Sequence, residues 1–348
     1  MKENKNNQKY IPVVSKTGKS LMPCHPARAN QLIRRCKAKK QWRGGIFYIK
    51  LIERKNGNIQ PIACGIDPGS KKEAITIRDK KKTFINIQLD AITHVKDRVK
   101  SRREMRRTRR SRNCPYRKCR YNRSRKKDFV APSTKARYDW KLKIINILNK
   151  LFPIKVIVYE DIKARSLKGK RKWNVSFSPL QTGKKYFIKK LKEITEVIIK
   201  YGYNTAEKRK ELGLKKDKNK LSTSFFAHCV DSWVLAGFGL LDSIDILDNK
   251  NIIFIKKIPF HKRQLHRFQF NKFGKRPRYG GTTSFGMSRG SIVKHKNFGM
   301  GRVGGFRTNS ILISFHKLNN YERGINLKIL YTKLIHLANC NWIWNNLV

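Results

Sequence analysis

The sequence predicts an α/β fold, in which apolar strands that end in acidic residues lie beside an amphipathic helix. Three apolar runs follow one another at hairpin spacing, at 59–67, 74–77 and 84–89. A fourth run, 154–161, is rich in β-branched residues and is expected to form a buried strand. Segment 227–236 instead has apolar residues at helical spacing.

The first run carries one acid, Asp67, which we expect near the middle of its strand. Pro68 and Gly69 follow it and turn the chain. A carboxylate in a buried strand is unfavourable unless it is paired or binds a metal. The alternative is an aspartate that caps the Pro-Gly turn, because turns favour this residue type. Taken alone, Asp67 fits either role.

Two later segments favour the metal. Glu160 lies at the end of the fourth run, and His228 and Asp231 stand three residues apart on the predicted helix, so they share one face. Carboxylate oxygens bind hard cations, and two such cations stabilise the attacking and leaving oxygens of an in-line displacement. Together with Asp67, these residues predict a magnesium-dependent phosphodiesterase.

The charge of the chain predicts a polyanionic partner. The 348 residues include 82 Lys and Arg against 22 Asp and Glu, a net charge of +60, so we expect nucleic acid to offset the self-repulsion. No stretch reaches 18 apolar residues and residues 1–9 are rich in Lys and Asn, which predicts neither a transmembrane span nor a secretory signal. Seven cysteines without a framework pattern predict a reducing compartment.

Three short motifs resemble those of a known nuclease family. Gly-Ile-Asp-Pro-Gly-Ser (65–70), Val-Tyr-Glu-Asp (158–161) and His-Cys-Val-Asp-Ser (228–232) look like the split motifs of a RuvC nuclease with an RNase H-like fold. More narrowly, the chain resembles the transposon-encoded IscB and IsrB proteins, which have an RRXRR/PLMP-type N-terminal region and are relatives of the two-nuclease CRISPR effectors. In IscB, an HNH nuclease lies between the second and third motifs. Here the interval 161–227 contains no His and no Cys, so the HNH-lacking IsrB is favoured.

The resemblance implies five parts in the chain. They are a PLMP-like N-terminal domain (1–58), RuvC segment I (59–92), an arginine-rich bridge helix with a basic loop (93–130), RuvC segments II and III without an HNH insertion (131–258), and a small β-barrel-like C-terminal domain that contacts the target-adjacent motif (259–348). Periodicity predicts the elements inside them. These are helices at 31–35, 132–151 and 183–201, a strand at 46–52, and short strands at 291–294, 302–306, 310–315 and 326–331.

The most basic stretch, 94–127, also has a helical prediction for its first half, because no Pro or Gly interrupts it before Pro115. Like charges at i,i+4 destabilise such a helix in isolation, and bound phosphates would reverse the sign. The alternative is a disordered basic arm. In the family this segment contacts guide RNA, and aromatic residues beyond it could stack on bases. The residues expected to bind RNA are Arg98, Arg102, Arg103, Arg106, Arg107, Arg109, Arg110, Arg112, Tyr116, Arg117, Tyr121 and Arg123.

The resemblance implies an RNA-guided DNA endonuclease that nicks the displaced, non-target strand. Asp67, Glu160 and Asp231 would hold two Mg²⁺ ions, with Mn²⁺ as a substitute, and His228 would orient or deprotonate the attacking water. The implied partners are a guide (omega) RNA and double-stranded target DNA with an adjacent motif, in a monomeric ribonucleoprotein without a membrane. The expected compartment is the cytoplasm at the nucleoid, or the interior of an organelle.

Two alternatives remain open at this point. One is a guide-independent, structure-specific endonuclease of RuvC type, against which the long arginine helix argues. The other is an RNA-binding protein that does not cleave. The intact residues at all four positions of the predicted site, the three acids and His228, argue against it, whereas Glu73 stands where the family usually has a small residue.

Overall fold

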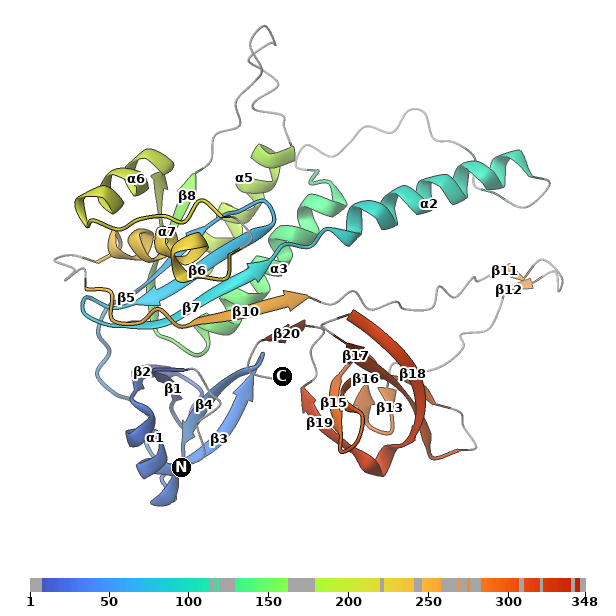
Figure 1. The fold of residues 1–348 in the computed structure, drawn as a ribbon, viewed down its shortest axis with the longest axis horizontal. Helices are drawn as coiled ribbons and strands as arrows, with labels where there is room; N and C mark the ends of the chain where they lie inside the picture. Colours follow the sequence, from blue (N-terminus) through green and yellow to red (C-terminus); the bar gives the residue numbers. More distant parts are fainter. Residues whose placement is uncertain are drawn as a thin grey trace, which may run out of the picture. The chain divides into compact units, whose positions relative to one another are not determined.

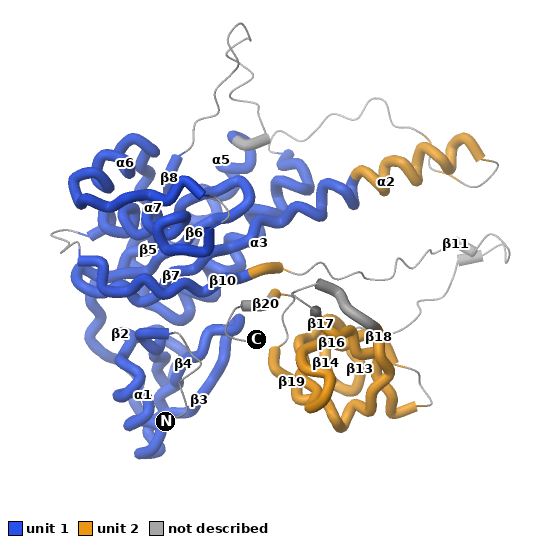
Figure 2. The backbone as a smooth tube through the Cα atoms, in the orientation of Figure 1, with its two compact units in different colours: residues 1–99, 122–255 blue, residues 100–121, 256–348 orange. Residues whose placement is uncertain are grey.

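The structure is a computed structural model (Figure 1). It describes residues 8–112, 116, 118, 129–161, 179–219, 222–240, 246–257, 268–269, 274–275, 283–306, 310–319, 322–338 and 342–344. Two compact units divide the chain (Figure 2). The first comprises residues 1–99 and 122–255, and the second comprises residues 100–121 and 256–348. None of the helices in the described part is long and apolar enough to cross a membrane.

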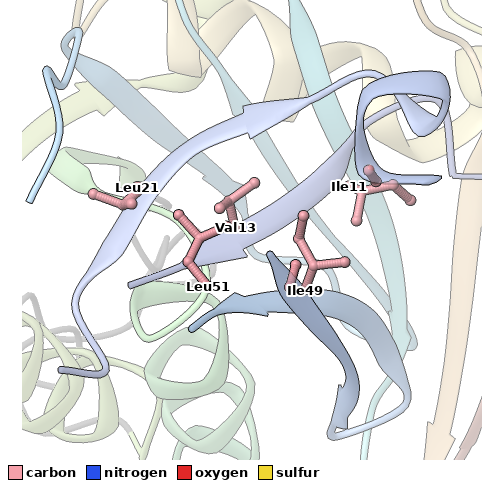
Figure 3. Close-up of a cluster of buried hydrophobic side chains, with 7 residues drawn as sticks. Ile11, Val13, Leu21, Ile49 and Leu51 are labelled. Atoms are coloured by element: carbon pink, nitrogen blue, oxygen red, sulfur yellow. The ribbon is translucent and has the colours of Figure 1, made fainter. Parts of the chain in front are cut away.

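The first unit begins with a small sheet in the order β2-β1-β4-β3. Its elements are β1 (Ile11–Val14), β2 (Ser20–Cys24), α1 (Pro26–Arg34), β3 (Ala38–Arg43) and β4 (Ile46–Leu51). Strands β1 and β4 are parallel, and the other neighbours are antiparallel. The apolar faces of these strands meet in one buried cluster (Figure 3), whose labelled members are Ile11, Val13, Leu21, Ile49 and Leu51.

Helix α1 is longer than predicted. The sequence indicated a helix only at 31–35, but α1 begins at Pro26, where proline is well tolerated because the first helical N–H has no partner in the helix. His25 caps it, since its Nδ1 accepts the backbone N–H of Ala27 at 3.3 Å. The predicted strand at 46–52 is confirmed as β4.

A larger sheet forms the core of the first unit, in the order β10-β7-β6-β5-β8-β9. Its strands are β5 (Ile62–Asp67), β6 (Lys72–Arg78), β7 (Thr83–Asp90), β8 (Ile154–Asp161), β9 (Glu196–Tyr201) and β10 (Ile252–Lys257). Strand β6 runs antiparallel to both β5 and β7, and the other neighbouring pairs are parallel. The five strands from β7 to β9 have the order and directions of an RNase H-like core, so the predicted α/β core is confirmed.

Two sequence predictions about this sheet are wrong. Asp67 is the last residue of β5 and does not lie near the middle of its strand. The helix predicted for 183–201 ends early, since α5 spans Pro179–Lys192 and β9 follows it. The β-branched run Val197–Ile199 pairs in parallel with β8 instead, because the sheet edge supplies hydrogen-bond partners that helical periodicity alone does not reveal.

Helices cover both faces of this sheet (Figure 1). They are α3 (Pro132–Asn149), α5, α6 (Gly202–Glu211) and α7 (Phe225–Gly237). Alternation along β6 separates the faces, because Glu73 contacts Lys141 of α3 whereas Thr76 hydrogen-bonds to Ser232 of α7. The helices predicted at 132–151 and 227–236 are confirmed as α3 and α7.

The second unit contains a five-stranded antiparallel sheet in the order β18-β17-β16-β15-β19. These strands are β15 (Ile292–His295), β16 (Gly299–Phe306), β17 (Leu312–Asn319), β18 (Glu322–Leu330) and β19 (Leu334–Ala338). Shorter elements are β11 (Phe268–Gln269), β12 (Gly274–Lys275), β13 (Thr283–Ser284), β14 (Met287–Ser288), η2 (Tyr331–Lys333) and β20 (Trp342–Trp344). The four predicted strands of this region correspond to β15–β18, and β19 forms in the tail for which the sequence predicted no element.

Candidate active site

Strands β5 and β8 bring Asp67 and Glu160 side by side. The two strands are parallel and paired so that Ile66 lies opposite Tyr159. One residue further along each strand, Asp67 therefore lies opposite Glu160, and a side-chain hydrogen bond joins the two carboxyl groups. Tyr159 points to the other face, where its ring centroid lies 5.5 Å from that of Phe187 in α5. Alternation then directs Glu160 to the face that α7 covers.

Gly65 determines how closely α7 approaches this face. A Cβ atom at Gly65 would lie 1.9 Å from the carbonyl oxygen of Ser232 and 2.5 Å from the backbone nitrogen of Ala236. The helix backbone therefore rests directly on the strand, two residues before Asp67. The Ser232 hydroxyl is also hydrogen-bonded to Thr76 of β6 at 2.8 Å. These contacts hold Asp231, the neighbour of Ser232, beside the ends of β5 and β8.

The three carboxyl groups act on one another electrostatically. The pKa of Asp67 is raised well above its usual value, first because the group is buried and then because Glu160 and Asp231 add negative charge nearby. Lys216 acts in the opposite direction and lowers the pKa of Asp67. Three acids from three separate segments thus share one site, and their common charge favours a bound proton or cation.

The donor set suits a hard divalent cation, because it consists of carboxylate oxygens. Protein cations engage part of this set. Asp231 Oδ1 accepts a hydrogen bond from Arg209 Nη1 at 2.5 Å, and Oδ2 accepts one from Lys216 Nζ. In the part of the chain that the structure describes, no three His, Cys, Asp or Glu side chains converge as a ready-made metal site. The residues therefore fit magnesium chemically, and a cation at Asp231 would compete with Arg209 and Lys216 for its charge.

His228 lies on α7, one turn before Asp231, and is half-buried. Its charge contributes to lowering the pKa of Asp217, after the larger effects of a backbone hydrogen bond from Asn219 and a hydrogen bond from Ser222. Because α7 includes both His228 and Asp231, the predicted helical spacing of these two residues is present. The role of His228 toward an attacking water stays a prediction.

The turn that follows Asp67 is tightly held. A Cβ atom at Gly69 would lie 1.6 Å from the carbonyl oxygen of Lys72, so this position admits no side chain. From α3, Arg137 Nη2 donates to the carbonyl oxygen of Ser70 at 2.8 Å and to that of Gly69 at 3.4 Å. A cation from a distant helix therefore fixes the backbone next to the first carboxylate.

Glu73, the residue that departs from the family pattern, has a charged partner of its own. Its carboxylate lies 3.2 Å from Lys141 Nζ and 3.8 Å from Arg137, and both Glu73 and Lys141 are buried. Burial raises the pKa of Glu73 against the opposing effect of Lys141, and burial lowers the pKa of Lys141. Glu73 is thus paired with a buried lysine. For both groups, burial shifts the pKa more than the charge of the partner does.

Sequence reasoning did not find Arg137, Lys141, Arg209 or Lys216. They are four among 82 basic residues, and none belongs to a recognisable motif. Their partners lie between 15 and 68 positions away along the chain, so only the folded structure brings them to the acids.

A second candidate region is α2 (His94–Ser111), which contains seven of the ten arginines predicted to bind RNA, with Arg112 directly after it. None of the residues of α2 is buried. The segment forms a helix over 94–111, as the absence of Pro and Gly predicted. Tyr116 is 54% exposed. Arg117, Tyr121 and Arg123 lie outside the described residues.

The chain is similar to a solved structure and to a family of proteins. Among solved structures, the chain is similar to T. thermophilus RuvC in complex with a Holliday junction substrate, with 11% sequence identity, 51% of this chain and 90% of that chain covered, and a TM-score of 0.27. The strand order and directions described above carry the RNase H-like assignment. A search of curated proteins found no match. Residues 11–172, which include Asp67, Glu160 and α2, match the model of RRXRR proteins. This match to the RRXRR family model agrees with the predicted likeness to IscB and IsrB proteins.

Proposed function

We propose that the protein is a magnesium-dependent endonuclease of RuvC type that is guided by RNA and nicks the displaced strand of duplex DNA. The observation that carries the proposal is the electrostatic effect of Glu160 in β8 and Asp231 in α7 on Asp67 in β5. Asp67 and Glu160 share a hydrogen bond, and the charge of Asp231 acts on Asp67. Acids that repel one another are retained where they have a cation to bind.

Asp67, Glu160 and Asp231 are the residues that would hold magnesium. When bound, Mg²⁺ supplies positive charge at the attacking and leaving oxygens of the scissile phosphate. The chain supplies the geometry. Strand pairing orients Asp67 and Glu160, and the contact of α7 with Gly65 positions Asp231. An imidazole nitrogen of His228 would accept the proton of the attacking water.

The basic surface supports an RNA partner. Helix α2 has seven arginines among its 18 residues, and none of these 18 residues is buried in the described structure. Arginine side chains bind phosphates in bidentate fashion, so RNA would stabilise a helix whose like charges repel. The net charge of +60 over the chain is in keeping with a large polyanion.

A single strand break follows from the composition of the interval between the second and third motifs. An HNH site requires histidines, and residues 161–227 contain none. One site thus remains for cleavage. An RNA–DNA heteroduplex occupies its own basic channel, which leaves the displaced single strand available to this site.

The test uses supercoiled plasmid, full-length protein, the RNA that co-purifies with it and Mg²⁺. We expect open circles to accumulate, with breaks mapped by strand-specific sequencing to the strand not paired with the RNA. Linear product at early times would contradict nicking. Cleavage of branched DNA without RNA would instead support a guide-independent nuclease, and RNA binding without any cleavage would support a non-cleaving RNA-binding protein.

A further inference from the structure

Asp231 lies between two protein cations that come from one segment of the chain. Arg209 is near the C-terminal end of α6, and Lys216 lies in the loop between α6 and α7. Each cation binds a different carboxylate oxygen. Asp231 itself is only 4% exposed, so it depends on these two partners for compensation of its charge.

The two cations differ in their freedom to leave. Arg209 extends from a helix, and its side chain is 19% exposed. Lys216 extends from a loop, and its side chain is 41% exposed. A lysine ammonium is a compact charge on a flexible four-carbon stem, and solvent can receive it while the stem stays packed. Lys216 is therefore the partner that Asp231 can release more readily.

Lys216 also acts on more than one of the acids. Burial lowers its pKa, but the hydrogen bond and charge of Asp231 together with the charge of Asp67 raise it more. In return, Lys216 lowers the pKa of Asp67. Its ammonium group therefore offsets charge at both Asp67 and Asp231, the acids to which a divalent cation would bind.

We propose that Lys216 is a built-in counter-ion of the metal-free site, which leaves Asp231 when a divalent cation binds. The proposal rests on the proposed magnesium chemistry and deepens it. Each oxygen of Asp231 accepts a hydrogen bond from a protein cation. A divalent cation on the same carboxylate would be repelled by both of these charges, so its binding favours the departure of one of them. Lys216 thus acts as a positioning residue that keeps the acids together until the cation replaces it.

If a divalent cation displaces Lys216 from Asp231, the variant Lys216→Met should have lower thermal stability but higher affinity for the cation. Without a divalent cation, the variant should melt at a lower temperature, because the acids lose a counter-charge. It should also bind Mn²⁺ about threefold to fivefold more tightly, because a partly exposed ion pair no longer competes. Lys215→Met is the matched control, since Lys215 is an exposed neighbour and its replacement removes the same charge from the chain. The control should change neither quantity.

The measurement is Mn²⁺ binding to the full chain, freed of nucleic acid, by electron paramagnetic resonance of unbound Mn²⁺, with thermal melts alongside. Equal or weaker Mn²⁺ binding by Lys216→Met than by Lys215→Met overturns the proposal while the metal site stands. Absence of Mn²⁺ binding by the wild-type protein overturns the metal site as well. A Lys216→Gln variant gives the same comparison if Lys216→Met fails to fold.

Amine acetylation gives an independent readout of the displacement. In the metal-free protein, Lys216 should react more slowly than Lys215, because its ammonium group donates to Asp231. Saturating Mg²⁺ should raise the rate at Lys216 relative to Lys215 within the same molecule, as followed by peptide mass spectrometry. A ratio that Mg²⁺ leaves unchanged, in protein shown to bind Mn²⁺, would mean that Lys216 keeps its partner and that the proposal is wrong.

Discussion

Gly65 of β5 and Ser232 of α7 touch through their backbones, because any Cβ atom at Gly65 would lie 1.9 Å from the Ser232 carbonyl oxygen. This close approach lies two residues from Asp67 on the strand and one residue from Asp231 on the helix. The separation of these two acids is therefore determined by a position that has no side chain. Any group added there must move the helix, and Asp231 with it.

Gly65→Ala is expected to lower stability by about 1–3 kcal/mol, the usual range for overpacking, and to weaken cleavage more than nucleic-acid binding. The added methyl group pushes α7 outward and separates Asp231 from Asp67. Thermal melts and cleavage rates measure the two effects. Gly305→Ala is the control for a methyl group added to a strand glycine, because a Cβ there would approach no atom closer than 3.8 Å. Unchanged melting and cleavage in Gly65→Ala would contradict the close packing.

Replacing any one of the three acids should abolish cleavage. We expect Asp67→Asn, Glu160→Gln and Asp231→Asn each to lose activity while the protein retains RNA and target binding, measured by gel shift. His228→Ala should lose about 10²–10⁴-fold, since proton transfer contributes that much. A variant of the acids that still cleaves at a near-normal rate removes that residue from the site.

The buried pair of Glu73 and Lys141 should be dispensable as a pair but not singly. Lys141→Met alone leaves Glu73 buried next to Arg137 only, and loss of one partner of a buried pair destabilises by about 3–5 kcal/mol. The double variant Glu73→Leu, Lys141→Met should be about as stable as wild type or more stable. Chemical denaturation at pH 7 of wild type, Glu73→Leu, Lys141→Met and the double variant forms the double-mutant cycle. A double variant as unstable as the single one would contradict this account.

The same pair predicts a pH dependence. The pKa of Glu73 is raised in the folded state, so its contribution to stability is full below the unfolded pKa of about 4.5 and is lost as the pH rises through the folded pKa. As the pH rises from about 4.5 through the folded pKa of Glu73, wild type should therefore lose stability relative to the double variant. Denaturation at pH 4.5 and pH 7 tests the sign, and a wild type that gains stability relative to the double variant between these values would refute it.

Neutralising the exposed arginines of α2 should weaken RNA binding and its dependence on salt. We expect the quadruple glutamine variant of Arg102, Arg103, Arg106 and Arg107 to flatten the slope of log affinity against log salt by about 0.7–0.9 for each phosphate that the helix no longer neutralises. The charge-matched control replaces four exposed lysines, Lys16, Lys19, Lys39 and Lys40. Equal slopes in wild type and the α2 variant would show that α2 does not bind RNA phosphates.

Thiol alkylation should follow burial. At pH 8, Cys36 is exposed and should react first among the described cysteines, whereas burial raises the pKa of Cys24 to about 11 and that of Cys64 to about 12. Cys229, buried in α7, should stay protected until the core unfolds. Peptide mass spectrometry resolves each site. Rapid alkylation of Cys229 in native protein would contradict the packing of α7 on the sheet, and rapid alkylation of Cys64 would contradict the burial of β5.

Local chemistry made several parts of this protein predictable from its sequence. The acids at 67, 160 and 231 end apolar runs or stand in an apolar helix, and a charge in such surroundings is recognisable because it is unfavourable without a partner. The helices α3 and α7 and the strands β5–β8 follow from side-chain periodicity, which depends only on neighbours along the chain. The charge of the chain likewise required no structure to indicate a polyanionic partner.

Tertiary structure alone decided the rest. Residues 196–201 have a pattern that fits a helix or a strand, and pairing with the edge of β8 selects the strand. The cations Arg209 and Lys216 meet Asp231, and Lys141 meets Glu73, only after distant segments pack together. Sequence determined which side chains carry chemistry, because that is a property of each residue. Folding decided which of 82 basic residues compensate the few buried acids, because ion pairing depends on distance in space and not along the chain.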